Sequence, residues 1–248
     1  MAQHLGQHFL VDASVARREV QYAALTPNDV VLEIGPGKGA LTKLLAGSAR
    51  QVIAIEIDPR LAQQLSLSLP SNVQIIQADA IAFDFTSLPR FTKVVANLPF
   101  WISSAITSKL LDCSFEKAVL VYQWEFAQRL VAGPGTKHYS RLSVFVAYKA
   151  ACRLLERVPR ESFSPPPEVD AAIVELIPRE QPAFPVRDEV FFFEVVRRLF
   201  SHRRKKIKTT LRSLCPDLEG LPFLEERVEQ LSPAQIGSLS DLLLERMP

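Results

Sequence analysis

Residues 30–39 decide the fold, and they read Val30-Val31-Leu32-Glu33-Ile34-Gly35-Pro36-Gly37-Lys38-Gly39. The β-branched first half is typical of a buried strand, and a helical pattern near Leu41–Ala46 follows the glycines. Glycines at a strand–helix junction let the backbone turn sharply and let a ligand approach it closely. The segment therefore predicts a strand, a loop and a helix that bind a nucleotide-containing cofactor. A tight turn without a ligand is the simpler alternative.

The alternation of strand and helix continues to about residue 150. Further strands are expected at Val52–Ile57, Val73–Gln77, Lys93–Asn97 and Ala118–Tyr122, and helices at Pro59–Leu69 and Ser103–Leu111. This order predicts a parallel sheet with right-handed crossovers, as in a Rossmann-like α/β fold. Two later runs, Cys152–Val158 and Val169–Ile177, have no long helix between them and predict an antiparallel pair at one edge of the sheet.

A proline-rich segment, residues 177–188, separates this region from a helical one. Beyond it, one helical face carries Val196, Phe200, Ile207, Leu211 and Leu214. Arg203 intrudes on that face, so either its side chain snorkels to solvent or the helix breaks near Ser201-His202. Ser232-Pro233 begins a last helix, with a capping serine before a proline. We expect one domain over residues 1–178 and a small all-helical C-terminal domain over residues 179–248.

Composition and length exclude several classes of protein. The 248 residues are 48% apolar and 23% charged, which is typical of a globular protein and not of a disordered or collagen-like one. No apolar run approaches the roughly 18 residues of a membrane span, and the N-terminus lacks the pattern of a secretory signal. The three cysteines lie far apart, outside any CxxC or Cys/His spacing. We therefore expect a cytoplasmic protein that contacts no membrane and holds no metal.

The net charge of +2 conceals an uneven distribution. A basic segment, residues 195–216, contains no acidic residue and eight basic ones: Arg197, Arg198, Arg203, Arg204, Lys205, Lys206, Lys208 and Arg212. Without them the chain has 21 basic and 27 acidic residues, a net charge of −6. A basic segment on an acidic body predicts local contact with a polyanion, and a solvated helix face is the alternative.

Acidic residues near three strand ends bear on the identity of the cofactor. Glu56 ends the second strand about 20 residues after the glycine loop, where a carboxylate accepts hydrogen bonds from the ribose of either NAD or S-adenosylmethionine. The loop lacks the G-x-G-x-x-G spacing, and Glu33 before it disfavours a pyrophosphate but suits a cationic sulfonium, which favours S-adenosylmethionine. Asp79, after the third strand, is expected to bind the adenine amino group, unless it only caps a helix.

The fourth strand ends in the most specific motif of the chain, Asn97-Leu98-Pro99-Phe100. The exocyclic amine of adenine is a poor nucleophile, because its lone pair is delocalised into the ring. The Asn97 side-chain oxygen and the Leu98 carbonyl can accept both amine hydrogens and hold the nitrogen for in-line attack on a methyl group. Pro99 restrains the chain, and Phe100 offers a stacking surface for a flipped base. The motif predicts an adenine methyltransferase, and a strand-end turn with a packed phenylalanine is the alternative.

A second aromatic element is the loop Phe163–Asp170, which contains three consecutive prolines. The prolines stiffen the loop, so that it can hold Phe163 against the other face of the base. The alternative is a rigid connection between two strands.

Together these motifs resemble the ribosomal RNA adenine dimethyltransferase (KsgA-like) family. The resemblance runs from about Gln3 to Leu244. Its motifs are, in order, Gln7-His8-Phe9-Leu10, Glu33–Gly39, Glu56-Ile57-Asp58, Ala78-Asp79-Ala80, Asn97–Phe100, residues 135–143, Phe163–Asp170 and Phe200–Leu211.

The resemblance implies a class I S-adenosylmethionine-dependent methyltransferase fold. It also implies transfer of four methyl groups to two adjacent adenosines near the 3′ end of small-subunit rRNA during ribosome biogenesis. By motif position, the cofactor contacts are His8, Leu10, Gly35, Gly37, Glu56, Asp79 and Asn97. The catalytic residues are Asn97, Leu98, Pro99, Phe100 and Phe163. His8 replaces the family's usual Asn, and Phe100 replaces the Tyr of bacterial members, which keeps stacking but loses a hydroxyl. The compact length resembles that of archaeal members.

The basic segment is the expected RNA contact, through Arg203, Arg204, Lys205, Lys206 and Lys208 on backbone phosphates. We expect a monomer that meets small-subunit rRNA within a pre-ribosomal particle. Three other functions stay open at this point. They are an Erm-type methyltransferase of large-subunit rRNA, a non-catalytic assembly or transcription factor on the same fold, and an NAD-dependent oxidoreductase. The last lacks a plausible proton-transfer residue.

Overall fold

The computed structural model describes residues 8–247, so Gln7 of the first motif lies outside the described residues. The chain divides into two compact units, one of residues 1–127 and 152–178 and the other of residues 128–151 and 179–248. Residues 128–151 therefore group with the second unit, while the domain limits at residue 178 stay a prediction. Within residues 8–247, no helix has the length and apolar character needed to cross a membrane.

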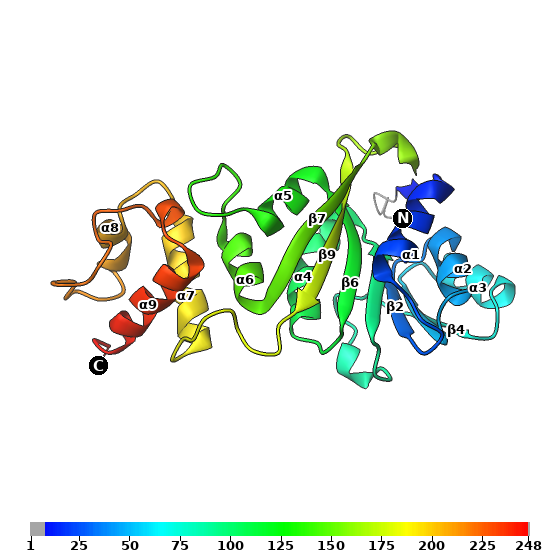
Figure 1. Ribbon diagram of the computed structural model, residues 1–248, viewed down its shortest axis with the longest axis horizontal. Coiled ribbons are helices and arrows are strands. Elements are labelled where there is room, and N and C mark those ends of the chain that lie inside the picture. The colour runs from blue at the N-terminus through cyan, green and yellow to red at the C-terminus, as the bar shows by residue number, and fades with distance from the viewer. Residues whose placement is uncertain (1–7, 248) are drawn as a thin grey trace. The chain divides into compact units, whose positions relative to one another are not determined.

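The first unit is built on a seven-stranded sheet in the order β4-β3-β2-β5-β6-β9-β7 (Figure 1). The strands are β2 (Val30–Ile34), β3 (Gln51–Glu56), β4 (Val73–Gln77), β5 (Lys93–Asn97), β6 (Lys117–Gln123), β7 (Ala150–Val158) and β9 (Ala171–Pro178). Strands β2 to β6 pair in parallel, and β9 is antiparallel to β6. The predicted Rossmann-like α/β fold is confirmed, and the parallel pairing brings the carboxyl ends of β2 to β5 together.

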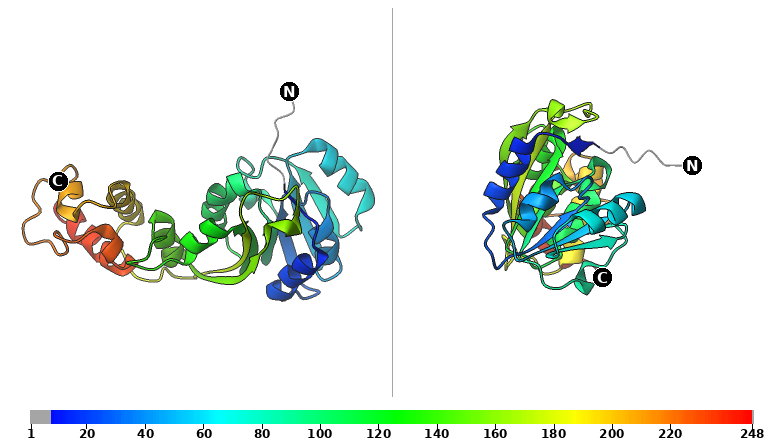
Figure 2. Two further views of the ribbon diagram at one scale, coloured as in Figure 1. Left: turned by 90° about the horizontal axis from the view of Figure 1, so that it is seen from above. Right: turned by 90° about the vertical axis from the view of Figure 1, so that its right-hand side faces the viewer.

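Helices alternate with these strands, and Figure 2 shows the twist of the sheet from two further sides. They are α1 (Ala13–Ala23), α2 (Ala40–Ala46), α3 (Pro59–Ser68), α4 (Ser103–Leu111) and α5 (Trp124–Val131). Every residue of β2 is buried, which explains why all of them except Glu33 are apolar. Asp58 caps α3 by accepting the N–H of Arg60, and Pro59 occupies the first turn.

A short strand pair connects two segments that are far apart in the sequence. Strand β1 (Phe9–Leu10) pairs antiparallel with β8 (Phe163–Ser164), so that Leu10 lies opposite Phe163. The 3₁₀ turn η3 (Arg160–Ser162) directly precedes β8, and two further 3₁₀ turns of the first unit are η1 (Phe85–Ser87) and η2 (Phe100–Ile102). The pairing keeps the first motif and the Phe163 loop together.

The second unit is helical. It contains α6 (Arg141–Lys149), α7 (Glu189–Ser201), α8 (Ile207–Leu211), the turn η4 (Val228–Gln230) and α9 (Pro233–Leu244). Its core includes the fully buried Tyr139 and Phe192. Of the two alternatives for Arg203, the structure has the helix break near Ser201-His202, because α7 ends at Ser201 and α8 begins only at Ile207. The serine–proline start of the last helix is also confirmed, since Ser232 accepts the N–H of Gln235.

Candidate active site

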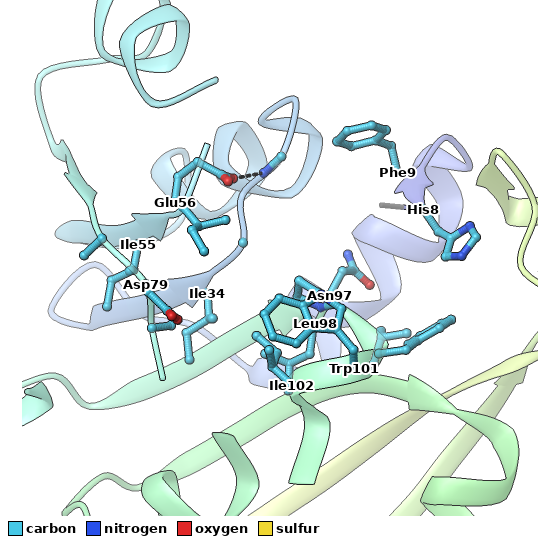
Figure 3. Close-up of a pocket in the computed structure, with 18 of the residues that line it drawn as sticks. His8, Phe9, Ile34, Ile55, Glu56, Asp79, Asn97, Leu98, Trp101 and Ile102 are labelled. Carbon is cyan, nitrogen blue, oxygen red and sulfur yellow. Dashed lines mark hydrogen bonds between the residues drawn. The ribbon is translucent and has the colours of Figure 1, made fainter. Parts of the chain in front are cut away.

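A pocket lies in the first unit at the carboxyl ends of β2, β3, β4 and β5 (Figure 3). Its lining includes these predicted site residues: His8, Gly35, Gly37, Glu56, Asp79, Asn97, Leu98, Pro99, Phe100 and Phe163. Leu10 lies outside the described lining and packs against the core from β1, so its cofactor contact stays a prediction. The fold thus gathers nearly all cofactor and catalytic residues of the sequence prediction into one cavity.

The loop after β2 depends on its glycines. Gly35 and Gly37 have φ angles of +71° and +57°, in the left-handed region that side chains disfavour. A Cβ on Gly35 would lie 3.2 Å from Cδ of Pro99, and a Cβ on Gly37 would lie 3.0 Å from the Phe9 ring. The loop therefore packs closely against the first motif and the Asn97–Phe100 motif while its backbone faces the pocket.

Glu56 anchors that loop to the end of β3. One carboxylate oxygen accepts the N–H of Gly37 at 3.0 Å, and the other accepts the N–H of Asp58 at 2.9 Å. Burial raises the pKa of Glu56, whereas these two N–H groups oppose the rise. Each oxygen keeps a further lone pair for a ligand hydroxyl.

Asp79 has a structural bond as well as a place in the pocket. Its Oδ1 accepts the N–H of Ile81 at 2.9 Å and so caps a turn, whereas the alternative expected from the sequence was the cap of a helix. The side chain is exposed and lines the cavity, so Oδ2 is free to accept a hydrogen bond from a ligand. The turn cap and the predicted ligand contact of Asp79 are therefore compatible.

Glu33 does not have the position that the sequence analysis gave it. It is 1% exposed and lies outside the described pocket lining. Burial raises its pKa to about 8, and the nearby carboxylate of Glu56 adds to the rise. Glu33 is therefore mostly neutral at pH 7, and the interpretation that its charge faces a cationic cofactor is wrong.

Asn97, at the end of β5, contributes a side-chain amide to the pocket (Figure 3). Its Oδ1 is buried and makes no hydrogen bond with any described residue. Buried acceptors are normally paired, so an unpaired one in a pocket indicates a partner that a ligand supplies. Leu98, 2% exposed, and Pro99, packed on Gly35, hold the chain around the adjacent carbonyl.

Two phenylalanines stand beside Asn97. The ring centroids of Phe100 and Phe163 are 6.4 Å apart, and their planes meet at 67°. The His8 ring lies 5.9 Å from Phe100, and its Nδ1 is 2.7 Å from the Pro165 carbonyl oxygen. Because the two phenylalanines are edge to face, one ring must turn before a base lies flat between them, and the predicted sandwich stays a prediction.

Ile57, Trp101 and Ile102 are among the apolar residues that line the pocket and were not predicted as site residues. Trp101 is 55% exposed, and among residues 8–247 no other Trp, Tyr or Phe side chain is exposed. Its position directly after Phe100 was the available signal. Exposure, however, follows from the 3₁₀ turn η2, which the sequence pattern does not reveal.

The basic segment is in the second unit, and most of its cations form ion pairs with acidic residues from outside the segment. Glu194 pairs with Arg197 and Arg198, Glu229 with Arg203, and Glu225 with Lys206 and Lys208. These cations hold the pKa values of Glu194 and Glu225 at about 2. Arg203 also donates to the carbonyls of Thr136 and Lys137. Among residues 8–247, only three of the eight cations lack an acidic partner: Arg204, Lys205 and Arg212.

Comparison with known proteins identifies a matching family and relatives that share one name. A model of the family "Ribosomal RNA adenine dimethylase" matches residues 1–244. A probable ribosomal RNA small subunit methyltransferase A from Methanosarcina mazei is 44% identical and covers 96% of this chain and 92% of its own. A protein of the same name from Methanococcus maripaludis is 43% identical, with 99% of each chain covered.

Two solved structures are similar over almost their full length. A dimethyladenosine transferase from Plasmodium falciparum has a TM-score of 0.80 and 30% identity, covering 94% of this chain and 96% of its own. The 23S rRNA methyltransferase ErmE has a TM-score of 0.70 and 31% identity, covering 95% of this chain and 99% of its own.

Proposed function

The chain belongs to the ribosomal RNA adenine dimethylase family, and we propose that it methylates the N6 amines of two adjacent adenosines near the 3′ end of small-subunit rRNA. Each adenosine receives two methyl groups from S-adenosylmethionine. The relatives from Methanosarcina mazei and Methanococcus maripaludis, at 44% and 43% identity, are named for the small subunit, which supports this substrate. The proposed setting is a pre-ribosomal particle in the cytoplasm, met by a monomer that uses no metal.

The residues of the pocket fit S-adenosylmethionine. Gly35 and Gly37 line the pocket without side chains, so a ligand can lie against the backbone. Glu56 would accept hydrogen bonds from the ribose hydroxyls, and Asp79 would accept one from the adenine amino group. When bound, the cofactor supplies an electrophilic methyl group on a positively charged sulfur.

The observation that carries the proposal is the buried, unpaired Oδ1 of Asn97 beside two aromatic rings. We assign Oδ1 and the Leu98 carbonyl oxygen as acceptors for the two hydrogens of the target amine. These bonds hold the nitrogen lone pair toward the methyl group and stabilise the positive charge that develops on nitrogen. Phe100 and Phe163 would stack on the flipped adenine and exclude water.

The reaction needs no protein base. The nitrogen–methyl bond forms as the sulfur–methyl bond breaks, and the protonated amine product is acidic enough to lose a proton to water. The two amine hydrogens are replaced one after the other. After the first transfer, the monomethylated amine must bind in the pocket again and donate its remaining hydrogen to one of the two acceptors. Asn97 and Leu98 together permit both rounds.

The second unit would hold the RNA backbone. Arg204 and Lys205 carry charges without an acidic partner, so phosphates meet them at no cost in broken ion pairs. Lys206 and Lys208 would have to exchange the exposed Glu225 for phosphate, which costs little because surface ion pairs are weak. Arg203 pairs with Glu229 and donates hydrogen bonds to the loop carbonyls, so we assign it a structural role rather than a phosphate contact.

The resemblance to ErmE supports a second candidate, an enzyme that methylates large-subunit rRNA. The test supplies separated, undermethylated small and large ribosomal subunits with methyl-labelled S-adenosylmethionine. We expect label in small-subunit RNA only. Label confined to large-subunit RNA would establish the second candidate, and the absence of label from both would overturn the proposed activity.

A further inference from the structure

Helix α1 carries a buried acid at the back of the pocket. Glu19 is 0% exposed, and α1 packs on β5 and β6. Neither carboxyl oxygen makes a hydrogen bond with any described residue. A buried carboxyl group without a partner costs several kcal/mol in general, so its presence calls for a reason other than packing.

The neighbour of Glu19 is the Asn97 side chain. The amide of Asn97 lies beside the carboxyl and favours its ionised form, as an amide N–H does. The Asn97 Oδ1 is the other buried polar atom without a bond at this point of the structure. The Glu19 carboxyl and the Asn97 amide are thus neighbours at the α1–β5 contact, and the carboxyl oxygens and Oδ1 have no hydrogen-bond partner among the described residues.

The Asn97 amide has a donor end and an acceptor end, and rotation about its last side-chain bond exchanges them. Only the orientation with Oδ1 toward the pocket can accept a hydrogen from the target amine. We propose that Glu19 is a positioning residue that selects this orientation: its ionised carboxyl accepts the Asn97 Nδ2–H and turns Oδ1 toward the adenine. This inference rests on the proposed role of Asn97.

The protonation state of Glu19 then matters for the rate. An ionised carboxyl can only accept, so it binds the Nδ2 end. A protonated carboxyl can also donate to Oδ1, and it would compete with the target amine for that atom. The ionised form is therefore the productive one.

Several charged groups act on Glu19. Burial raises its pKa to about 8, Glu33 on β2 and Glu156 on β7 raise it further, and Asn97 and Arg18 oppose the rise. The effect of Arg18 is weakened because its guanidinium pairs with Glu156 at 2.8 Å. With a pKa near 8, about a tenth of Glu19 is ionised at pH 7 and about nine-tenths at pH 9.

The first experiment measures single-turnover methyl transfer from pH 6 to pH 9.5, with saturating S-adenosylmethionine and small-subunit RNA. In the wild type we expect the rate to rise with pH through one inflection, by up to about a hundredfold between pH 6 and pH 9.5, because the ionised fraction of Glu19 rises by that factor. Glu19→Gln should give a flat profile with unchanged cofactor affinity. Glu19→Ile, which cannot hold the amide, should give a flat profile at a rate at least about tenfold lower.

Two control variants test whether the inflection in the pH profile belongs to Glu19. Glu33→Gln should keep it, shifted to lower pH, because a neighbouring acid has been removed. Glu175→Gln makes the same chemical change at a buried acid on β9, 7% exposed and paired with Lys117 and Arg153, and should leave the profile unchanged. An inflection that persists in Glu19→Gln, or a wild-type rate in Glu19→Ile at every pH, would overturn the proposal.

A second readout needs no substrate. The side-chain NH₂ signal of Asn97 in a ¹H–¹⁵N spectrum, identified by its loss in Asn97→Ala, should move with the inflection in the wild type and stay still in Glu19→Gln. A signal that ignores pH in the wild type would show that Glu19 does not touch the amide. If the wild type transfers no methyl group but this signal titrates, the proposed function fails and the positioning role of Glu19 stands.

Discussion

Replacing Glu33 by glutamine should change how the stability of the first unit depends on pH. Both Glu33 and Glu19 are fully buried acids whose pKa values are raised from 4.5 to about 8 in the folded state. Between these two pH values the folded chain binds a proton at each site that the unfolded chain releases. The free energy of unfolding therefore falls as pH rises from about 4.5 to about 8, and it levels off above that range.

The slope follows from the number of protons. Each such acid lowers the free energy of unfolding by about 1.4 kcal/mol per pH unit within the window, so the two together give about 3 kcal/mol per unit. Glu33→Gln removes one proton and should halve the slope. From pH 5.5 to pH 7.5 the variant should lose about 3 kcal/mol less stability than the wild type, a large share of the total for a typical domain.

Tryptophan fluorescence during urea unfolding measures this effect in the right part of the chain. The chain has two tryptophans, Trp101 and Trp124, and both belong to the first unit. Transitions at pH 5.5, 6.5 and 7.5 give the slope for the wild type, for Glu33→Gln and for Glu33→Gln combined with Glu19→Gln. The double variant should be nearly flat. Parallel slopes for all three would show that these acids are ionised in the folded protein and would refute the reasoning.

Three further predictions concern the sites themselves. Asn97→Ala should lower single-turnover methyl transfer by about 10²–10³ because one acceptor is lost, with a smaller change in cofactor affinity by calorimetry; a wild-type rate would exclude the assigned role. Glu56→Ala should weaken S-adenosylmethionine binding by at least about tenfold, since it also leaves the Gly37 and Asp58 N–H groups unpaired; unaltered binding by calorimetry would contradict this. Arg204→Ala with Lys205→Ala should weaken RNA binding and reduce its logarithmic salt slope by about 2, measured by filter binding from low to moderate salt; an unchanged slope would mean that phosphates bind elsewhere.

The parallel sheet could be predicted because its strands are buried on both faces. Val30–Ile34 and Lys93–Asn97 are short segments rich in valine and other apolar residues, and their predicted limits match the structure. The residues at their carboxyl ends then had to meet, which placed Glu56, Asp79 and Asn97 in one pocket. Local signals sufficed for these elements.

Features that depend on distant parts of the chain could not be predicted. The basic segment itself contains no acidic residue. Glu225 and Glu229, which follow α8 in the sequence, nevertheless form ion pairs with its cations. Glu33 is adjacent to the glycine loop, but the pattern of a fully buried strand does not say which face a side chain takes. Glu19 is one acid in an otherwise ordinary helix, and its contact with Asn97 exists only because α1 packs on β5.

The most direct test of the account is the position and chemistry of the methyl groups. Small subunits that lack the modification are incubated with methyl-labelled S-adenosylmethionine and either the wild type or Asn97→Ala, and the rRNA is then digested and mapped by mass spectrometry. We expect N6,N6-dimethyladenosine at two adjacent positions near the 3′ end with the wild type, and none with the variant. Methyl groups at other positions, on other atoms, or in equal amount with Asn97→Ala would contradict it.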